Sequence, residues 1–226
     1  MTPGTAPLAE LFEETPEELR RQALSHSSWV EDRTSSYGRL AFLGDSVLGL
    51  SVATLLFSEH PDADIGELTK ILNQAVSGRA CAAVARDLGL PEMLTDRSPS
   101  DGDGLPVETL LASERTLASV CEAVIGACYL EHGFERTSVA VAAAFDEEIE
   151  QATLERLDFK SELQERLARM GETVLYEVSS EVGPPHERRF EMRATVAGDE
   201  IGTGSGRSKK EAEQEAARRA LENLKR

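Results

Sequence analysis

The chain has 226 residues, of which 40% are hydrophobic and 29% are charged. This length suits one domain of about 150 residues followed by one of about 70, or a single large domain, and the apolar content is sufficient for packed cores. The formal net charge of −17 excludes a uniformly basic nucleic-acid-binding protein. It does not exclude a local basic face on an acidic body.

The negative charge is distributed unevenly along the chain. Residues 158–226 contain 13 Lys/Arg and 14 Asp/Glu, a net charge of −1, whereas residues 1–157 contain 11 and 27, a net charge of −16. The last third of the chain is therefore nearly neutral, and any basic face is expected there.

The cysteines and the N-terminus indicate the compartment. Three cysteines lie in apolar helical stretches and lack Cys-x-x-Cys spacing: Cys81, Cys121 and Cys128. This pattern is typical of reduced thiols packed in a core. No signal peptide is apparent, and no stretch of 18 apolar residues predicts a membrane span. We expect a cytoplasmic protein with no membrane partner.

Residues 1–155 predict helices throughout. One helix is expected to begin at residues 15–18, with Thr15 as the cap and Pro16 in the first position. Residues 40–50 give a helix that is apolar almost all round, interrupted by one Asp, which predicts a central, buried helix. A loop is expected over residues 96–107. Further helices are expected over Ile65–Leu88 with a break near Gly78, from Glu108 through Leu130, and over Ser138–Arg156.

After Leu157 the hydrophobic pattern changes to that of a small α+β domain, residues 158–226. Alternating apolar and polar residues predict half-buried strands between two helices. The expected order is α-β-β-β-α, with both helices on one face of the sheet. The expected elements are a helix Ser161–Met170, strands Thr173–Glu181 and Arg189–Ala197, a turn at Gly198-Asp199, a strand Glu200–Ser205 and a helix Ser208–Leu224.

Three separated motifs in this domain suit binding to a phosphate backbone. Residues 159–165 give a helix with an exposed polar face, and residues 183–187 (Gly-Pro-Pro-His-Glu) give a stiff loop between two strands. Residues 202–210 place a glycine-rich turn before a basic helix start, where backbone N–H groups and the helix dipole favour phosphate. Alone, the basic residues could be only a solvated helix start. Small residues would let that last helix lie close to the sheet (Ala212, Ala216, Ala217 and Ala220).

Together, the three motifs resemble the double-stranded-RNA-binding domain over about 68 residues. The resemblance implies that Gln164 and Glu165 touch one minor groove and that His186 reaches the next. The phosphates between would be contacted by Arg207, Lys209 and Lys210. Such binding reads the A-form shape more than the base sequence and weakens as salt rises.

The sharpest pattern in the first domain is Arg39–Leu48, an apolar stretch that carries one acid, Asp45. It resembles the ribonuclease III signature. Ala23–Ser28 resembles the early helix of that family, and Leu117–Gly126 resembles its last catalytic helix. The likeness covers residues 8–150 and, with the second domain, gives the bacterial ribonuclease III arrangement. It implies an all-α endonuclease-type domain over residues 1–155.

The family hydrolyses RNA duplexes with a divalent metal held by clustered carboxylates. Its pattern has acids at six positions, of which this chain retains Asp45 and Glu122. The other four positions carry Gly38, Ala41, Ile65 and Ser119. The family pattern also has a basic residue at the position of Leu72. This chain keeps a basic residue, Lys70, two positions earlier. The resemblance therefore implies Asp45 and Glu122 as catalytic and metal-binding residues for Mg²⁺, or Mn²⁺, if the reduced site binds metal at all.

Two alternatives remain open at this site. Glu67 or Glu114 could replace a lost acid, although neither spacing places it on the required helix face. Asp45 and Glu122 could equally be acids kept for packing or for hydrogen bonds within the helix.

The family's nuclease domain is a symmetric dimer, and the resemblance assigns Phe42 to its interface. The alternative is that Phe42 is an ordinary core residue. A homodimer is expected, and a heterodimer with an active paralogue is a further possibility.

Two functions follow. The first is a protein that binds double-stranded RNA on a nuclease scaffold, with weak or absent cleavage because four of six carboxylates are replaced. The second is an active double-stranded-RNA endonuclease that processes RNA with Asp45 and Glu122 at a reduced metal site.

Overall fold

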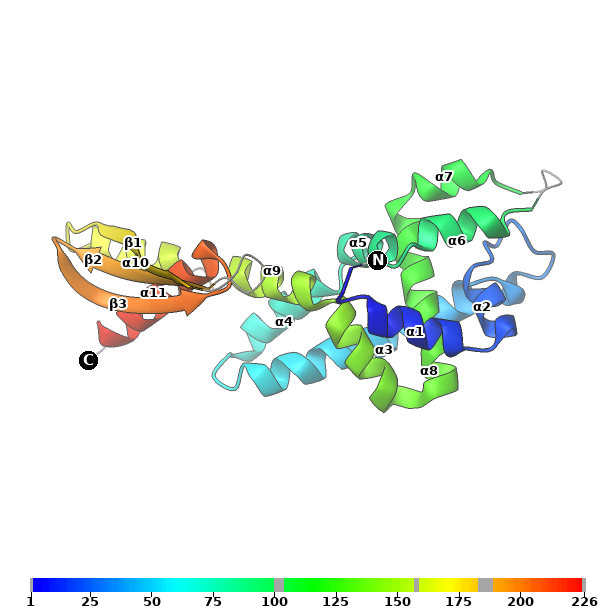
Figure 1. Cartoon of the computed structure of the whole chain (residues 1–226), viewed down its shortest axis with the longest axis horizontal. Coiled ribbons are helices and arrows are strands. Elements are labelled where there is room, and N and C mark those ends of the chain that lie inside the picture. The colour runs from blue at the N-terminus through cyan, green and yellow to red at the C-terminus, as the bar shows by residue number, and fades with distance from the viewer. Residues whose placement is uncertain (1, 100–103, 157–158, 183–188, 225–226) are drawn as a thin grey trace. The chain divides into compact units, whose positions relative to one another are not determined.

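The computed structural model describes residues 2–99, 104–156, 159–182 and 189–224. The chain forms two compact units, Met1–Ala152 and Thr153–Arg226. The first unit is helical, and the second contains a three-stranded antiparallel sheet with flanking helices (Figure 1). This confirms the fold class expected from the sequence, an all-α domain followed by a small α-β-β-β-α domain.

The break expected near Gly78 is confirmed, because one helix ends at Ala75 and the next begins at Gly78. The last helix predicted, Ser138–Arg156, is instead the end of one helix and the whole of another, and the earlier of the two is kinked at Gly133 (φ 75°). The helices are α1 (Ala6–Glu14), α2 (Glu17–Ala23), the short 3-10 helix η1 (Arg33–Ser35), α3 (Gly38–Glu59), α4 (Ile65–Ala75), α5 (Gly78–Asp87), α6 (Leu90–Arg97), α7 (Val107–Leu111), α8 (Glu114–Ala144) and α9 (Asp146–Arg156).

The core of the first unit is built around α3 and α8, which pack along one another. One face of α3 is buried, including Val47, Leu48 and Val52. The other face is not, so the expectation of a helix buried all round is wrong. Phe42 and Phe57 are 80% and 76% exposed.

Helix α3 bears on the expectation that the chain has no membrane span, because core helices and membrane spans can share its length and composition. Its 22 residues include a window with a mean hydropathy of 1.9, which is long and apolar enough by length and composition alone. The packing of its buried face against α8 gives a direct physical reason for this apolar composition.

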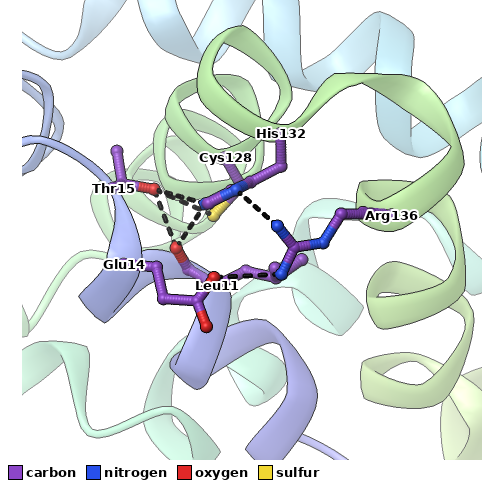
Figure 2. A network of polar contacts seen from close by, with 6 residues as sticks. All are labelled: Leu11, Glu14, Thr15, Cys128, His132 and Arg136. Atoms are coloured by element: carbon purple, nitrogen blue, oxygen red, sulfur yellow. Dashed lines mark hydrogen bonds and ion pairs between the residues drawn. The ribbon is translucent and has the colours of Figure 1, made fainter.

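Thr15 does not cap α2, as the sequence suggested, but closes α1 (Figure 2). Its hydroxyl donates to the backbone carbonyl of Leu11 at 2.8 Å. The same carbonyl accepts from Nε2 of His132, also at 2.8 Å, and Arg136 pairs with Glu14 at 2.9 Å. These contacts tie the end of α1 to α8. The residue that precedes α2 is Pro16, and no side chain caps this helix start.

The second unit consists of α10 (Phe159–Ala168), β1 (Val174–Val182), β2 (Arg189–Val196), β3 (Asp199–Gly206) and α11 (Lys209–Asn223), with strand order β1-β2-β3. The turn between β2 and β3 comes one residue earlier than predicted. It is formed by Ala197 (φ 52°) and Gly198 (φ 94°), and Asp199 already pairs with Val196. Two successive residues with positive φ suit a two-residue hairpin.

The third strand expected over Glu200–Ser205 is confirmed as β3, but the glycine-rich turn expected from Gly202 onward is not formed. Gly202, Gly204 and Gly206 lie in β3 and alternate along it, so they share one face. A β-carbon on Gly204 would lie 2.2 Å from the backbone nitrogen of Ala216 in α11. These glycines allow the helix to approach the sheet backbone directly, and the buried alanines of α11 do the same from the other side, as expected.

Candidate carboxylate site and nucleic-acid interface

The carboxylate site lies where α3 and α8 cross at very short range. A β-carbon on Gly44 would lie 1.7 Å from the carbonyl oxygen of Glu122, and one on Gly126 would lie 2.2 Å from that of Leu40. Only glycine permits such an approach of two helix backbones. The crossing sets Asp45, which follows Gly44, beside Glu122.

Electrostatic coupling between the two acids reflects this proximity. Glu122 is partly buried, and burial, followed by the negative charge of Asp45, raises the pKa of its carboxyl to about 7. Asp45 itself is exposed. Burial raises the pKa of the Cys81 thiol on α5, and the charges of Glu122 and Asp45 raise it further. The structure thus brings together the two acids singled out in the sequence, with an inert buried thiol behind them.

The four replaced positions place no carboxylate at this crossing. Ala41 is 6% exposed and packs in the core, and Ser119 offers only a hydroxyl. Gly38 begins α3, and Ile65 begins α4 with 84% of its surface exposed. Leu72, at the position of the family's basic residue, packs against the core, while Lys70 is exposed.

The two acids considered as replacements lie in other settings. Glu67 is part of the cap of α4, where its carboxylate accepts the Asp64 N–H at 3.0 Å and its own N–H donates to Asp64 at 2.9 Å. Glu114 is the exposed first residue of α8.

Within the described ranges, no three His, Cys, Asp or Glu side chains form a group that could hold a metal ion. Mg²⁺ takes near-octahedral oxygen coordination and usually keeps several waters. The donors at the crossing are the carboxylates of Asp45 and Glu122 and the hydroxyl of Ser119. They fit the family's metal cluster only in part.

The first RNA-binding segment predicted, on α10, is accessible. Gln164 and Glu165 are exposed, whereas Leu163 and Leu167 on the opposite face are buried in the core of the second unit. Glu165 has a loose ion pair with Arg169, at 3.8 Å. The side chains that would meet RNA therefore occupy the polar face of the helix.

The basic segment is presented at the start of α11. Arg207, Lys209 and Lys210 are exposed, and Lys209 Nζ lies 5.8 Å from the ring centroid of Phe190. The hydroxyl of Ser208 accepts the Glu211 N–H at 3.1 Å, and the carboxylate of Glu211 accepts the Arg207 N–H. Side chains of the protein thus already accept hydrogen bonds from two backbone N–H groups at the helix start. We therefore expect the three cationic side chains, rather than backbone N–H groups, to make most of the phosphate contacts.

His186 and the rest of its predicted loop lie outside the described residues. Its proposed contact with a second minor groove remains a prediction.

One contact that the sequence did not suggest joins the two segments predicted to bind RNA. Lys160 at the start of α10 pairs with Glu213 on α11. The two residues are 53 positions apart, so no local pattern could reveal the pair.

Comparison with known proteins supports both units. A family model described as Ribonuclease-III-like matches residues 16–148, and one described as Double-stranded RNA binding motif matches residues 159–224. Ribonuclease 3 of Symbiobacterium thermophilum is 41% identical over 217 residues, covering 93% of this chain and 89% of that protein. Ribonuclease 3 of Bacillus licheniformis is 38% identical over 214 residues, covering 92% and 84%.

A solved structure agrees for the first unit. The nuclease domain of ribonuclease III from Campylobacter jejuni is 26% identical, with a TM-score of 0.51, and the match covers 63% of this chain and 96% of that one. Its description refers to a region involved in dimer formation. The matches define a nuclease-type helical domain followed by a double-stranded-RNA-binding motif. The chain belongs to the ribonuclease III family, as its sequence motifs suggested.

Proposed function

We propose that this chain binds double-stranded RNA through residues 159–224 and cleaves it weakly or not at all. The family match of this segment supports duplex binding, as do the exposed polar face of α10 and the exposed cations at the start of α11. Binding is expected to follow the shape and phosphates of the duplex rather than its sequence.

The observation that carries the proposal of weak cleavage is the shortage of carboxylates where α3 and α8 cross. Asp45 and Glu122 are present, but Ala41 and Ser119 stand one helical turn from them where the family has acids. In this family a bound divalent metal activates water and neutralises charge on the departing oxygen. With two anionic ligands instead of four at the crossing, a hydrated ion would be held and oriented less firmly, and electrostatic stabilisation is often the largest catalytic contribution.

An active endonuclease is the second candidate function. The relatives that support it are named Ribonuclease 3 and match over most of the chain. The two acids retained lie together, and a carboxyl with a raised pKa beside a second acid is common in catalytic sites. Mg²⁺ or Mn²⁺ would then be held by Asp45 and Glu122 together with water.

We also infer that the first unit forms a homodimer through α3. Phe42 is 80% exposed, which leaves its alternative role as a core residue without support. Beside it lies a pocket of about 580 Å³ whose lining includes Leu40, Leu43 and Leu130. A two-fold contact would let Phe42 of each copy enter the pocket of the other.

A heterodimer with an active paralogue would use the same surface and would cut one strand only. The three free, buried cysteines favour a reducing compartment such as the cytoplasm as the setting.

A gel assay tests the proposed function. The purified chain is incubated with a labelled duplex of about 30 base pairs, since one such domain spans about 16 base pairs, first with Mg²⁺ and then with Mn²⁺. Retarded but intact RNA is expected. Cut products with staggered ends would favour the endonuclease, and RNA that is neither retarded nor cut would contradict both functions.

A further inference from the structure

Lys160 joins three elements of the second unit. Its backbone N–H donates to the side-chain carbonyl of Gln214 at 3.2 Å, and its ammonium group pairs with the carboxylate of Glu213, both on α11. The ammonium group also lies 4.9 Å from the ring centroid of Tyr176 on β1, a cation–π distance. The start of α10 is therefore fixed against α11 and the sheet.

The Lys160–Glu213 pair is better shielded from water than other ion pairs of the unit. Its side chains are 34% and 23% exposed, whereas those of Arg193 and Glu177 are 47% and 58% exposed. The Arg193 pair is also looser, at 3.8 Å. A partly desolvated ion pair in contact with an aromatic ring interacts more strongly than an exposed pair in water.

Glu213 stands where a negative charge would oppose RNA binding. It follows Lys209 by four residues and Lys210 by three, so it lies on the same side of α11 as these two cations. An unpaired carboxylate there would repel the phosphates that Lys209 and Lys210 are expected to contact. Lys160 supplies the positive charge that faces this carboxylate.

We propose that Lys160 is a positioning residue for RNA binding, which acts by holding and neutralising Glu213 beside the phosphate-binding lysines. The inference rests on the proposed duplex-binding role of α11. It differs from a direct contact between Lys160 and RNA, because the effect of removing Lys160 then depends on Glu213 being present.

The test measures the Kd of the full chain for a duplex of about 30 base pairs by fluorescence anisotropy, with thermal denaturation of every variant. Lys160→Ala is expected to weaken binding by about tenfold. Lys160→Ala combined with Glu213→Ala should return the Kd to within about twofold of the wild type, since no carboxylate then remains to repel phosphate. Glu213→Ala alone should bind as tightly as the wild type or more tightly.

Arg193→Ala is the matched control, because it removes the same charge from an ion pair on the sheet. Its Kd should stay within about twofold of the wild type. Lys160→Arg keeps the ion pair and should keep the affinity, which separates loss of the pair from loss of the fold.

Three results would overturn the proposal while the wild type still binds RNA. They are a Lys160→Ala variant that binds normally, a double variant as weak as Lys160→Ala, and a Glu213→Ala variant that binds more weakly than the wild type. Failure of the wild type to bind any duplex would instead overturn the proposed function on which the inference rests.

Discussion

The α-carbon of Gly44 is so close to α8 that a β-carbon on it would lie 1.7 Å from the backbone carbonyl oxygen of Glu122. This contact joins the two helices of the core and also places the acids of the candidate site beside each other. Gly44→Ala should force the helices apart and lower the free energy of unfolding by at least about 2 kcal/mol, as overpacking of a tight interior does.

Urea denaturation checks this expectation, and Gly49→Ala on the same helix is the control. Nothing lies within 4 Å of a β-carbon at Gly49, so alanine there should raise stability by about 0.5–1 kcal/mol through helix propensity. Equal effects of the two substitutions would show that the close crossing contributes nothing.

The raised pKa of Glu122 predicts a pH dependence of stability. In the folded protein the pKa of this carboxyl is about 7, above its ordinary value of 4.5, because the group is partly buried and faces Asp45. Between these two pH values the folded state retains a proton that the unfolded state loses, so this group lowers stability as pH rises through the window. Glu122→Gln should therefore gain stability relative to the wild type from pH 5 toward pH 8.

Denaturation midpoints in a metal-free buffer with chelator measure this difference. Glu131→Gln, an exposed position on the same helix, is the control and should show no such trend. A constant difference between Glu122→Gln and the wild type across the range would argue against a buried, proton-retaining carboxyl.

The exposed lysines at the start of α11 should set the salt dependence of RNA binding. Lys209→Ala with Lys210→Ala should weaken retention of a duplex and reduce the slope of log K against log salt by about 2, one for each lysine that no longer neutralises a phosphate. Arg218→Ala with Arg219→Ala removes the same charge from the same helix, but both arginines pair with Glu215. This control should change the slope much less, and an unchanged slope in the lysine variant would refute the assignment.

Phe42 should determine the oligomeric state of the chain. Replacing this 80% exposed ring by alanine removes the group expected to enter the partner's pocket, so Phe42→Ala should shift the protein from dimer toward monomer in sedimentation velocity. Phe57→Ala, a similarly exposed phenylalanine on α3 that does not line this pocket, should have a smaller effect. A wild-type chain that sediments as a monomer at all concentrations would contradict the dimer.

Periodicity and turn residues predicted the element order well because these signals are local. The helix break before Gly78 and the two half-buried strands were found in this way. The third strand was also found, but its glycines were in addition interpreted as a turn, because glycine serves close backbone approach as well as positive φ and one sequence does not distinguish the two.

Local sequence patterns could not predict contacts between residues that are far apart in the chain. Lys160 and Glu213 are joined only by the packing of α10 on α11, and each alone looks like a solvated charge. Hydrophobic periodicity alone did not reveal the exposure of Phe42, because an apolar residue in an apolar helix fits a core as well as an interface, and the family resemblance alone favoured the interface.

The rate at which the chain cuts a labelled RNA duplex, measured with protein in excess and saturating Mg²⁺, tests most directly whether two carboxylates suffice for catalysis. Wild type and Glu122→Gln are compared side by side on RNA that both retain. We predict that the wild type cuts the duplex at most slowly and that both proteins leave most of it intact. Rapid metal-dependent cleavage by the wild type that disappears in Glu122→Gln would contradict this prediction and establish Glu122 as part of a working site.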